Sequence, residues 1–172
     1  MQKSSLLSIA TLVACAAPTL LAQTYGVGRP ATADEVAAWD VTIGPQGREL
    51  PAGSGTAKDG AQVYEVRCKE CHGDQGGGGD HAALVGKPEQ LKQTPPLKTV
   101  GSYWPYATTL FDYTRRAMPF EEPGTLSADQ VYAVTAYILH LNGLVAEDDV
   151  LDRESLPQVV MPNRDGFVRD PR

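Results

Sequence analysis

The sequence predicts a mainly α-helical single domain that follows an N-terminal arm and precedes an irregular C-terminal tail. Two segments, around residues 56–68 and 127–141, carry apolar positions at helical spacing, and the second begins with capping residues. Glycine and proline interrupt most of the chain between them, which indicates an irregular connection. A length of 172 residues without an internal repeat agrees with one domain.

The residues Cys68-Lys69-Glu70-Cys71-His72 form a C-x-x-C-H motif at the end of the first of these helices. This spacing is typical of c-type haem attachment, because two thiols three positions apart can form thioethers to the vinyl groups of one porphyrin. The imidazole of His72 then reaches the iron as the proximal axial ligand. A redox-active C-x-x-C pair would not need the histidine, and a structural zinc site would need two more nearby ligands. The motif therefore predicts one covalently bound haem c.

The first predicted helix contains Gly60 and Tyr64, and the last one contains Tyr137. Glycine inside a helix costs stability relative to alanine unless another element has to approach closely. The last helix begins with the capping box Ser127-Ala128-Asp129-Gln130 and stops at Asn142-Gly143. At these positions the sequence resembles the class I cytochromes c, whose first and last helices cross with a glycine and an aromatic residue against an aromatic residue. The resemblance implies a class I cytochrome c-like fold with a single haem.

Met118 is predicted to be the second axial ligand, because it lies between the motif and the last helix, where class I cytochromes place theirs. A methionine thioether is a soft ligand that favours ferrous iron and raises the reduction potential. Pro119 would fix the backbone beside it. A lone methionine otherwise fills a gap in a core, which is the alternative for Met118. Three side chains compete for the ligand role: His81 is expected at the surface, His140 at the surface or against the arm, and Met161 in a docking or packing role.

Aromatic and basic side chains between the motif and the last helix are expected to line the haem pocket. Tyr103, Trp104 and Tyr106 can donate hydrogen bonds to the haem propionates while their rings pack on the porphyrin edge. Arg115 or Arg116 can neutralise a propionate, since guanidinium pairs well with carboxylate. The alternative for the two arginines is a solvated basic pair at a helix end.

The N-terminus has the pattern of an export signal, in which Lys3 precedes an apolar run over residues 6–21. The run is too short and too interrupted for a membrane span. Cleavage after Ala22 is the preferred interpretation, but Leu12-Val13-Ala14-Cys15 also resembles a lipoprotein signal, in which Cys15 would carry the lipid anchor. Both alternatives place the mature chain in the periplasm, where bacteria attach haem c.

The formal net charge of −6 and the isoelectric point near 5.0 argue against binding to nucleic acid. They do not favour an anionic membrane surface either, and no transmembrane span is expected in the mature chain. An acidic surface suits a soluble carrier that meets a basic patch on a partner.

The arm contains Thr32-Ala33-Asp34-Glu35, a capping box that predicts a short helix ending near Trp39. Trp39 is expected to anchor the arm by packing, and a contact with a partner is the alternative. The arm and the acidic tail after Gly143 are the expected docking elements for partners. The chain is thus divided into a signal peptide, an arm, a cytochrome c domain and a tail: residues 1–22, 23–55, 56–143 and 144–172.

Four stretches of the mature chain carry a more specific likeness: residues 25–31 (YGVGRPA), 98–107 (KTVGSYWPYA), 115–120 (RRAMPF) and 161–167 (MPNRDGF). They resemble the SoxD cytochromes of the bacterial sulfur-oxidising (Sox) system. In that family the cytochrome partners a molybdenum-cofactor subunit related to sulfite oxidase. It accepts electrons from the oxidation of protein-bound sulfane sulfur or of sulfite. The resemblance implies the haem residues Cys68, Cys71, His72 and Met118.

The resemblance implies an electron-transfer subunit that is not catalytic on its own and that passes electrons to a downstream cytochrome. Longer SoxD proteins carry a second haem domain, whereas this chain has one C-x-x-C-H motif. One alternative is therefore a generic soluble or lipid-anchored carrier between respiratory complexes. Another is a haem enzyme or sensor with an open distal site, which requires that Met118 does not bind iron.

Overall fold

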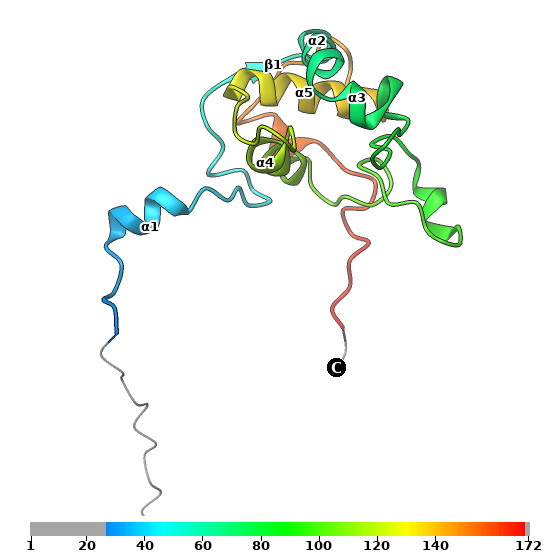
Figure 1. Ribbon diagram of the computed structural model, residues 1–172. Helices are drawn as coiled ribbons and strands as arrows, with labels where there is room; N and C mark the ends of the chain where they lie inside the picture. The colour runs from blue at the N-terminus through cyan, green and yellow to red at the C-terminus, as the bar shows by residue number, and fades with distance from the viewer. Residues whose placement is uncertain (1–26, 171–172) are drawn as a thin grey trace, which may run out of the picture.

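The computed structural model describes residues 27–170, so the predicted leader, with its cleavage site and Cys15, lies outside the described residues. The described chain contains α-helices, short 3-10 helices (η) and one two-stranded sheet (Figure 1). None of its helices is long and apolar enough to cross a membrane. The elements in chain order are α1 (Ala33–Trp39), β1 (Ser54–Gly55), α2 (Ala57–Arg67), α3 (Lys69–His72), η1 (Asp74–Gly76), η2 (Pro88–Lys92), α4 (Ala107–Ala117), α5 (Ala128–Leu141), β2 (Leu151–Asp152) and η3 (Leu156–Gln158).

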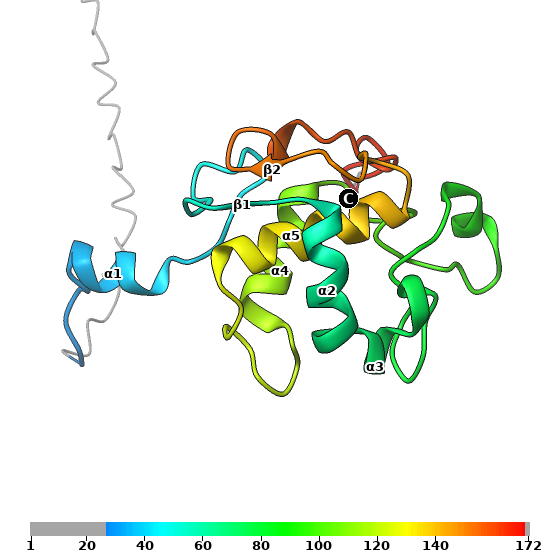
Figure 2. The same cartoon turned by 90° about the horizontal axis from the view of Figure 1, so that it is seen from above.

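Helices α2 and α5 cross in contact at the centre of the molecule (Figure 2). The contact depends on Gly60, because a Cβ atom there would lie 1.9 Å from the carbonyl oxygen of Ala133 and 2.9 Å from the Cβ of Tyr137. Beside it, the rings of Tyr64 and Tyr137 lie 5.2 Å apart between centroids. The predicted crossing and the class I cytochrome c-like fold are confirmed.

Local capping explains where these helices begin. Thr56 Oγ1 accepts the Asp59 N–H at the start of α2, and the predicted Ser127 and Gln130 capping box opens α5. The α5 helix ends at Leu141, and Gly143 has a φ of 72°, as expected for a glycine stop.

Helix α4 completes the core by packing against α5. The ring of Phe111 on α4 lies 4.4 Å from the ring of Tyr132 on α5, and both side chains are fully buried. Since α4 ends at Ala117, it places residue 118 at the edge of this core. The connection between α3 and α4 contains only two short 3-10 helices, as the glycines and prolines predicted.

The tail packs onto the core rather than extending from it. Leu151 in β2 pairs with Gly55 in β1, and Leu156 and Met161 are completely or almost completely buried. The boundary drawn at residue 143 thus separates elements that share one hydrophobic core. The described tail also has two continuous exposed runs, residues 146–150 and 164–170.

The arm forms the predicted capped helix, but its expected packing is wrong. Trp39 is 87% exposed, and no residue of α1 is buried, so Trp39 does not anchor the arm. Figure 1 shows α1 standing away from the body of the protein. Contact with the body begins only at Ile43, which is buried. The sequence could not reveal this, because an apolar side chain at a helix end is compatible with either location.

Candidate haem site

The motif occupies the end of α2 and the single turn of α3. Cys68 is the C-cap of α2, and the N–H groups of both Cys71 and His72 donate to its carbonyl. The hydroxyl of the buried Tyr64, one turn earlier on α2, donates to the carbonyl of Gly73 at 2.8 Å. The turn that carries the motif is therefore held in place by the same helix that crosses α5.

The two thiols are free: Cys68 is half-buried against the hydrophobic core, and Cys71 is exposed. Burial raises the pKa of Cys68 to about 11. A redox-active thiol pair requires a thiol with a lowered pKa, so the environment of Cys68 does not favour that alternative.

The orientation of His72 fits an axial ligand. Its Nδ1 lies 3.0 Å from the carbonyl oxygen of Ala82, and since a carbonyl can only accept, the proton belongs on Nδ1. The other ring nitrogen, Nε2, is then the one with a lone pair for a metal. A metal-binding histidine is usually oriented in this way, by a hydrogen bond from the ring nitrogen that does not bind the metal.

The glycine-rich loop makes that hydrogen bond possible. The N–H of Gly78 donates to the carbonyl of His72, and the N–H of His81 donates to the carbonyl of Cys71. A Cβ atom on Gly73, whose φ is 74°, would lie 2.2 Å from the carbonyl oxygen of Gly78, so the loop can fold back only onto glycine. Nothing in the sequence pointed to Ala82, because it contributes a backbone carbonyl that any residue could supply.

Met118 lies directly after α4, half-buried, with its N–H bonded to the carbonyl of Thr114. Arg67, the residue before Cys68, reaches the turn that follows Met118. Its Nη2 donates to Glu122 Oε2 at 2.7 Å and to Thr125 Oγ1 at 2.8 Å. Figure 2 shows the α4–α5 loop and α3 at the same end of the molecule. The structure therefore ties the Met118 segment to the helix that carries the motif.

The three side chains that compete with Met118 as the second axial ligand have different environments. Met161 is 1% exposed within the core, which confirms its packing role. His81 is exposed, as predicted, with its ring centroid 6.2 Å from that of His72. His140 is half-buried, and its Nδ1 lies 3.1 Å from the carbonyl oxygen of Val145 in the tail, so the tail and not the arm is its neighbour.

Tyr103 and Trp104, both half-buried, face different parts of the molecule. The ring of Tyr103 packs edge-on against Phe167 of the tail at 5.2 Å, with the ammonium group of Lys98 4.9 Å from its centroid. The ring of Trp104 packs edge-on against Tyr113 of α4 at 5.8 Å. Only Trp104 thus lies against the helix that leads to Met118, and contact of either ring with haem stays a prediction.

Arg116 is paired with a residue that the sequence did not single out. Its Nε donates to Asp112 Oδ1 at 2.9 Å, and the same oxygen accepts the N–H of Ile43 at 3.0 Å. Burial raises the pKa of Asp112, but the bonds from Arg116 and Ile43 outweigh it and hold the pKa below its usual value. Asp112 therefore anchors the arm to α4 and is paired with Arg116, and a haem propionate partner remains predicted for Arg115, which is half-buried.

Together, the crossed α2 and α5, the C-x-x-C-H turn at the end of α2 and the methionine after α4 define a class I cytochrome c. The family described as cytochrome c oxidase, cbb3-type, subunit III matches residues 55–138. A chain of the sulfane dehydrogenase SoxCD from Paracoccus pantotrophus is 44% identical, with a TM-score of 0.78 over 87% of this chain and 74% of that one. No curated protein matches. The chain belongs to the SoxD-type cytochromes c, as its sequence predicted.

As a cytochrome c, the chain is a haem protein that transfers electrons. Within residues 27–170, no group of three or more His, Cys, Asp or Glu side chains is arranged to hold a metal ion. The donors that are present fit a haem instead: two free thiols three positions apart, one oriented imidazole, and a thioether on a segment tied to the motif helix.

Proposed function

We propose that the chain is the monohaem electron-transfer subunit of a periplasmic, molybdenum-dependent dehydrogenase of sulfur compounds. Its electrons come from the oxidation of sulfane sulfur or sulfite by the molybdenum subunit and pass to a downstream cytochrome. The subunit has no catalytic residues of its own.

In this proposal, Cys68 and Cys71 hold one haem c through thioether bonds, and His72 and Met118 occupy the two axial positions. Haem iron bound in this way accepts and releases one electron without binding substrate. The hydrogen bond from His72 to Ala82 keeps the imidazole in one orientation during both steps. Trp104 and the core residues behind it exclude water from one side of the site.

The extent of the likeness to SoxCD carries the proposal. The cytochrome family matches only residues 55–138, whereas the 44% identity extends over 87% of the chain. It therefore includes segments outside the haem domain, which a carrier with unrelated partners would have no reason to share. About a quarter of the SoxCD chain has no counterpart here.

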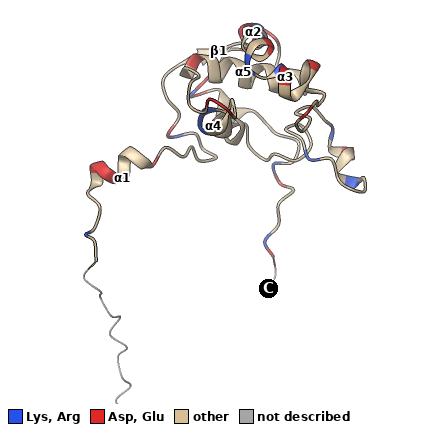
Figure 3. Ribbon diagram, in the orientation of Figure 1, with Lys and Arg blue, Asp and Glu red and all other residues tan. Residues whose placement is uncertain are grey.

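The charge around the motif supports docking with basic partners. Within residues 65–74 and 121–122, acidic side chains outnumber Lys and Arg by five to two. Lys69 pairs with Glu65 at 2.7 Å and with Asp74 at 3.0 Å, so both basic residues of this region are already paired. Figure 3 shows acidic residues on α2 and α3. A basic surface on the downstream cytochrome would complement this end of the molecule.

The test is purification of the tagged full-length chain from its native host grown on thiosulfate. A molybdenum-containing protein should copurify, and thiosulfate or sulfite should reduce the haem of the complex. A chain that neither binds such a protein nor is reduced by it would be a general carrier, and the proposal would fail.

Mass spectrometry of the same preparation tests the cofactor and the location. We expect one haem mass on the mature chain and cleavage after Ala22, or instead a lipid-modified Cys15. A chain without covalent haem, or one that retains residues 1–22, would contradict this part of the proposal.

A further inference from the structure

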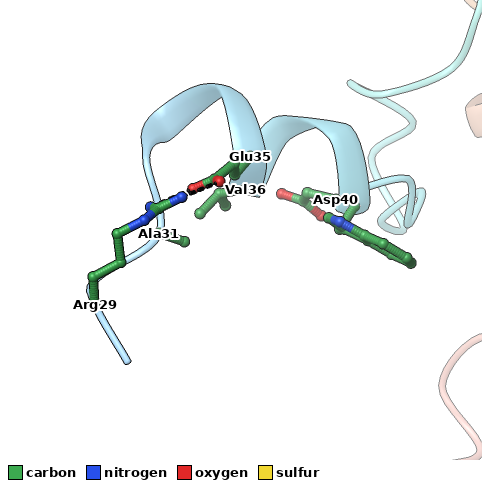
Figure 4. A pocket seen from close by; sticks show the side chains of 6 residues that line it. Arg29, Ala31, Glu35, Val36 and Asp40 are labelled. Atoms are coloured by element: carbon green, nitrogen blue, oxygen red, sulfur yellow. Dashed lines mark hydrogen bonds and ion pairs between the residues drawn. The ribbon is translucent and has the colours of Figure 1, made fainter. Parts of the chain in front are cut away.

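Helix α1 presents an apolar face that the rest of the described chain does not cover. Val36 is 53% exposed and Trp39 is 87% exposed, and their spacing of three residues puts them on one side of the helix. Val36 borders a shallow concavity together with Arg29, Glu35 and Asp40 (Figure 4). Exposed tryptophan beside other apolar side chains is typical of protein–protein contacts.

This helix is ordered by local interactions alone. A helix of seven residues is marginal in water, yet α1 carries a complete capping box in which Thr32 and Glu35 bond each other's N–H groups. Arg29 adds two hydrogen bonds to Glu35, and this pairing lowers the pKa of Glu35 to about 2. These contacts hold in helical form a segment that buries nothing in its own chain, which reduces the entropy lost when a partner binds.

The base of the arm fixes where a bound partner would sit. The N–H of the buried Ile43 is bonded to Asp112 on α4, the helix that ends at Met118. Only three residues separate Trp39 from Ile43, and they span at most about 14 Å. A protein that binds α1 is therefore held beside the haem domain.

The charge of α1 and the extent of the match to SoxCD indicate the kind of partner that the helix binds. Arg29 and Glu35 neutralise each other, whereas Asp34 and Asp40 form no ion pair within residues 27–170, so the helix carries a net negative charge. In addition, residues 43–172 make up only about three quarters of the chain. The 87% match to a chain of SoxCD therefore extends into the residues before Ile43.

We propose that α1 docks as an amphipathic helix into an apolar groove of the molybdenum subunit, with Trp39 as the buried anchor. Asp40, which borders the same concavity as Val36, faces basic residues at the rim of that groove. The arm thus tethers the cytochrome to its electron donor and leaves the acidic end around the motif free for the downstream cytochrome. This inference rests on the proposed function, since it assumes that the molybdenum subunit is the partner.

The test compares arm variants of the haem-loaded full-length chain for binding to the molybdenum subunit recovered by copurification. Trp39→Ala should raise the dissociation constant about 30-fold or more, as expected for the loss of a central aromatic anchor. Trp39→Phe, which keeps an aromatic ring, should recover most of the affinity. Thr32→Ala removes the cap and should weaken binding several-fold through loss of helix. Val160→Ala, at a side chain that is 75% exposed in the tail, is the control and should stay within about twofold.

The outcomes separate this inference from the proposed function. Since α1 buries nothing in its own chain, the variants should keep the haem spectrum and the stability of the wild type. If the wild type binds the molybdenum subunit and Trp39→Ala binds equally well, α1 is not the docking element and only this inference is wrong. If the wild type does not bind a molybdenum subunit at all, both are wrong.

Discussion

Replacing Gly60 by alanine tests the helix crossing on which the fold depends. A Cβ atom at residue 60 would lie 1.9 Å from the carbonyl oxygen of Ala133 and 2.4 Å from its carbonyl carbon. Both are backbone atoms of α5, so a change of rotamer cannot relieve the overlap. The two helices would have to move apart by more than an ångström, and the contacts of Tyr64 with Tyr137 would loosen with them.

Two effects of opposite sign set the magnitude. Alanine is favoured over glycine inside a helix by about 1 kcal/mol. Extra atoms forced into a packed contact cost about 1–3 kcal/mol, and an overlap with backbone belongs at the upper end of that range. The expected net loss in the free energy of unfolding is about 2 kcal/mol. For a mature chain of about 150 residues, the melting temperature should fall by about 4–8 °C.

Urea unfolding of the haem-loaded protein, followed by circular dichroism and haem absorbance, measures this loss. Gln62→Ala on the exposed side of α2 is the matched control, and it should change the stability by less than about 0.5 kcal/mol. A Gly60→Ala protein as stable as the wild type, or more stable, would refute the close crossing, because helix propensity alone would then be acting.

Three further changes test the site. Met118→Ala should abolish the weak near-infrared band of methionine-to-iron ligation and lower the reduction potential, because a soft ligand to ferrous iron is lost; an unchanged spectrum would contradict the assignment. Arg67→Ala should cost less than about 1 kcal/mol of stability, since its pair with Glu122 is partly exposed, yet the same band should be lost at a lower temperature than in the wild type. Equal loss in both proteins would contradict the role of Arg67. Asp112→Asn should lower the free energy of unfolding by about 1–3 kcal/mol at neutral pH. Because the folded pKa of Asp112 is depressed, its contribution is present above the unfolded pKa and is lost as the pH falls through the folded pKa. The difference between wild type and variant should therefore shrink in acid, and a pH-independent difference would count against the ion pair.

The haem motif, the helix boundaries and the crossing could all be predicted because each depends on residues close in sequence or on a steric rule. Ser127 and Gln130 cap α5 through their own local bonds, and Gly60 is needed where two backbones meet. The likeness to SoxD cytochromes was readable for the same reason, since it consists of contiguous stretches. The motif, the caps and this likeness did not require the relative placement of distant segments, and the crossing of α2 with α5 was implied by the resemblance to class I cytochromes c.

The contacts that orient the haem site could not be predicted from the sequence. The carbonyl of Ala82 carries no side-chain signal, and Arg67 and Asp112 look like ordinary surface charges until the chain folds. Their partners lie 10, 55 and 69 residues away in the sequence, so only the tertiary structure pairs them.

The N-terminal arm shows most clearly the difference between what the sequence determines and what the tertiary structure decides. The sequence by itself determined that residues 33–39 form a helix, because Thr32 and Glu35 cap it from within. Whether Trp39 is buried or exposed depends on what the body of the protein offers as a surface, and that is a property of the folded chain. Only the tertiary structure decided that the helix stands free, and the free face then became the docking element that we propose.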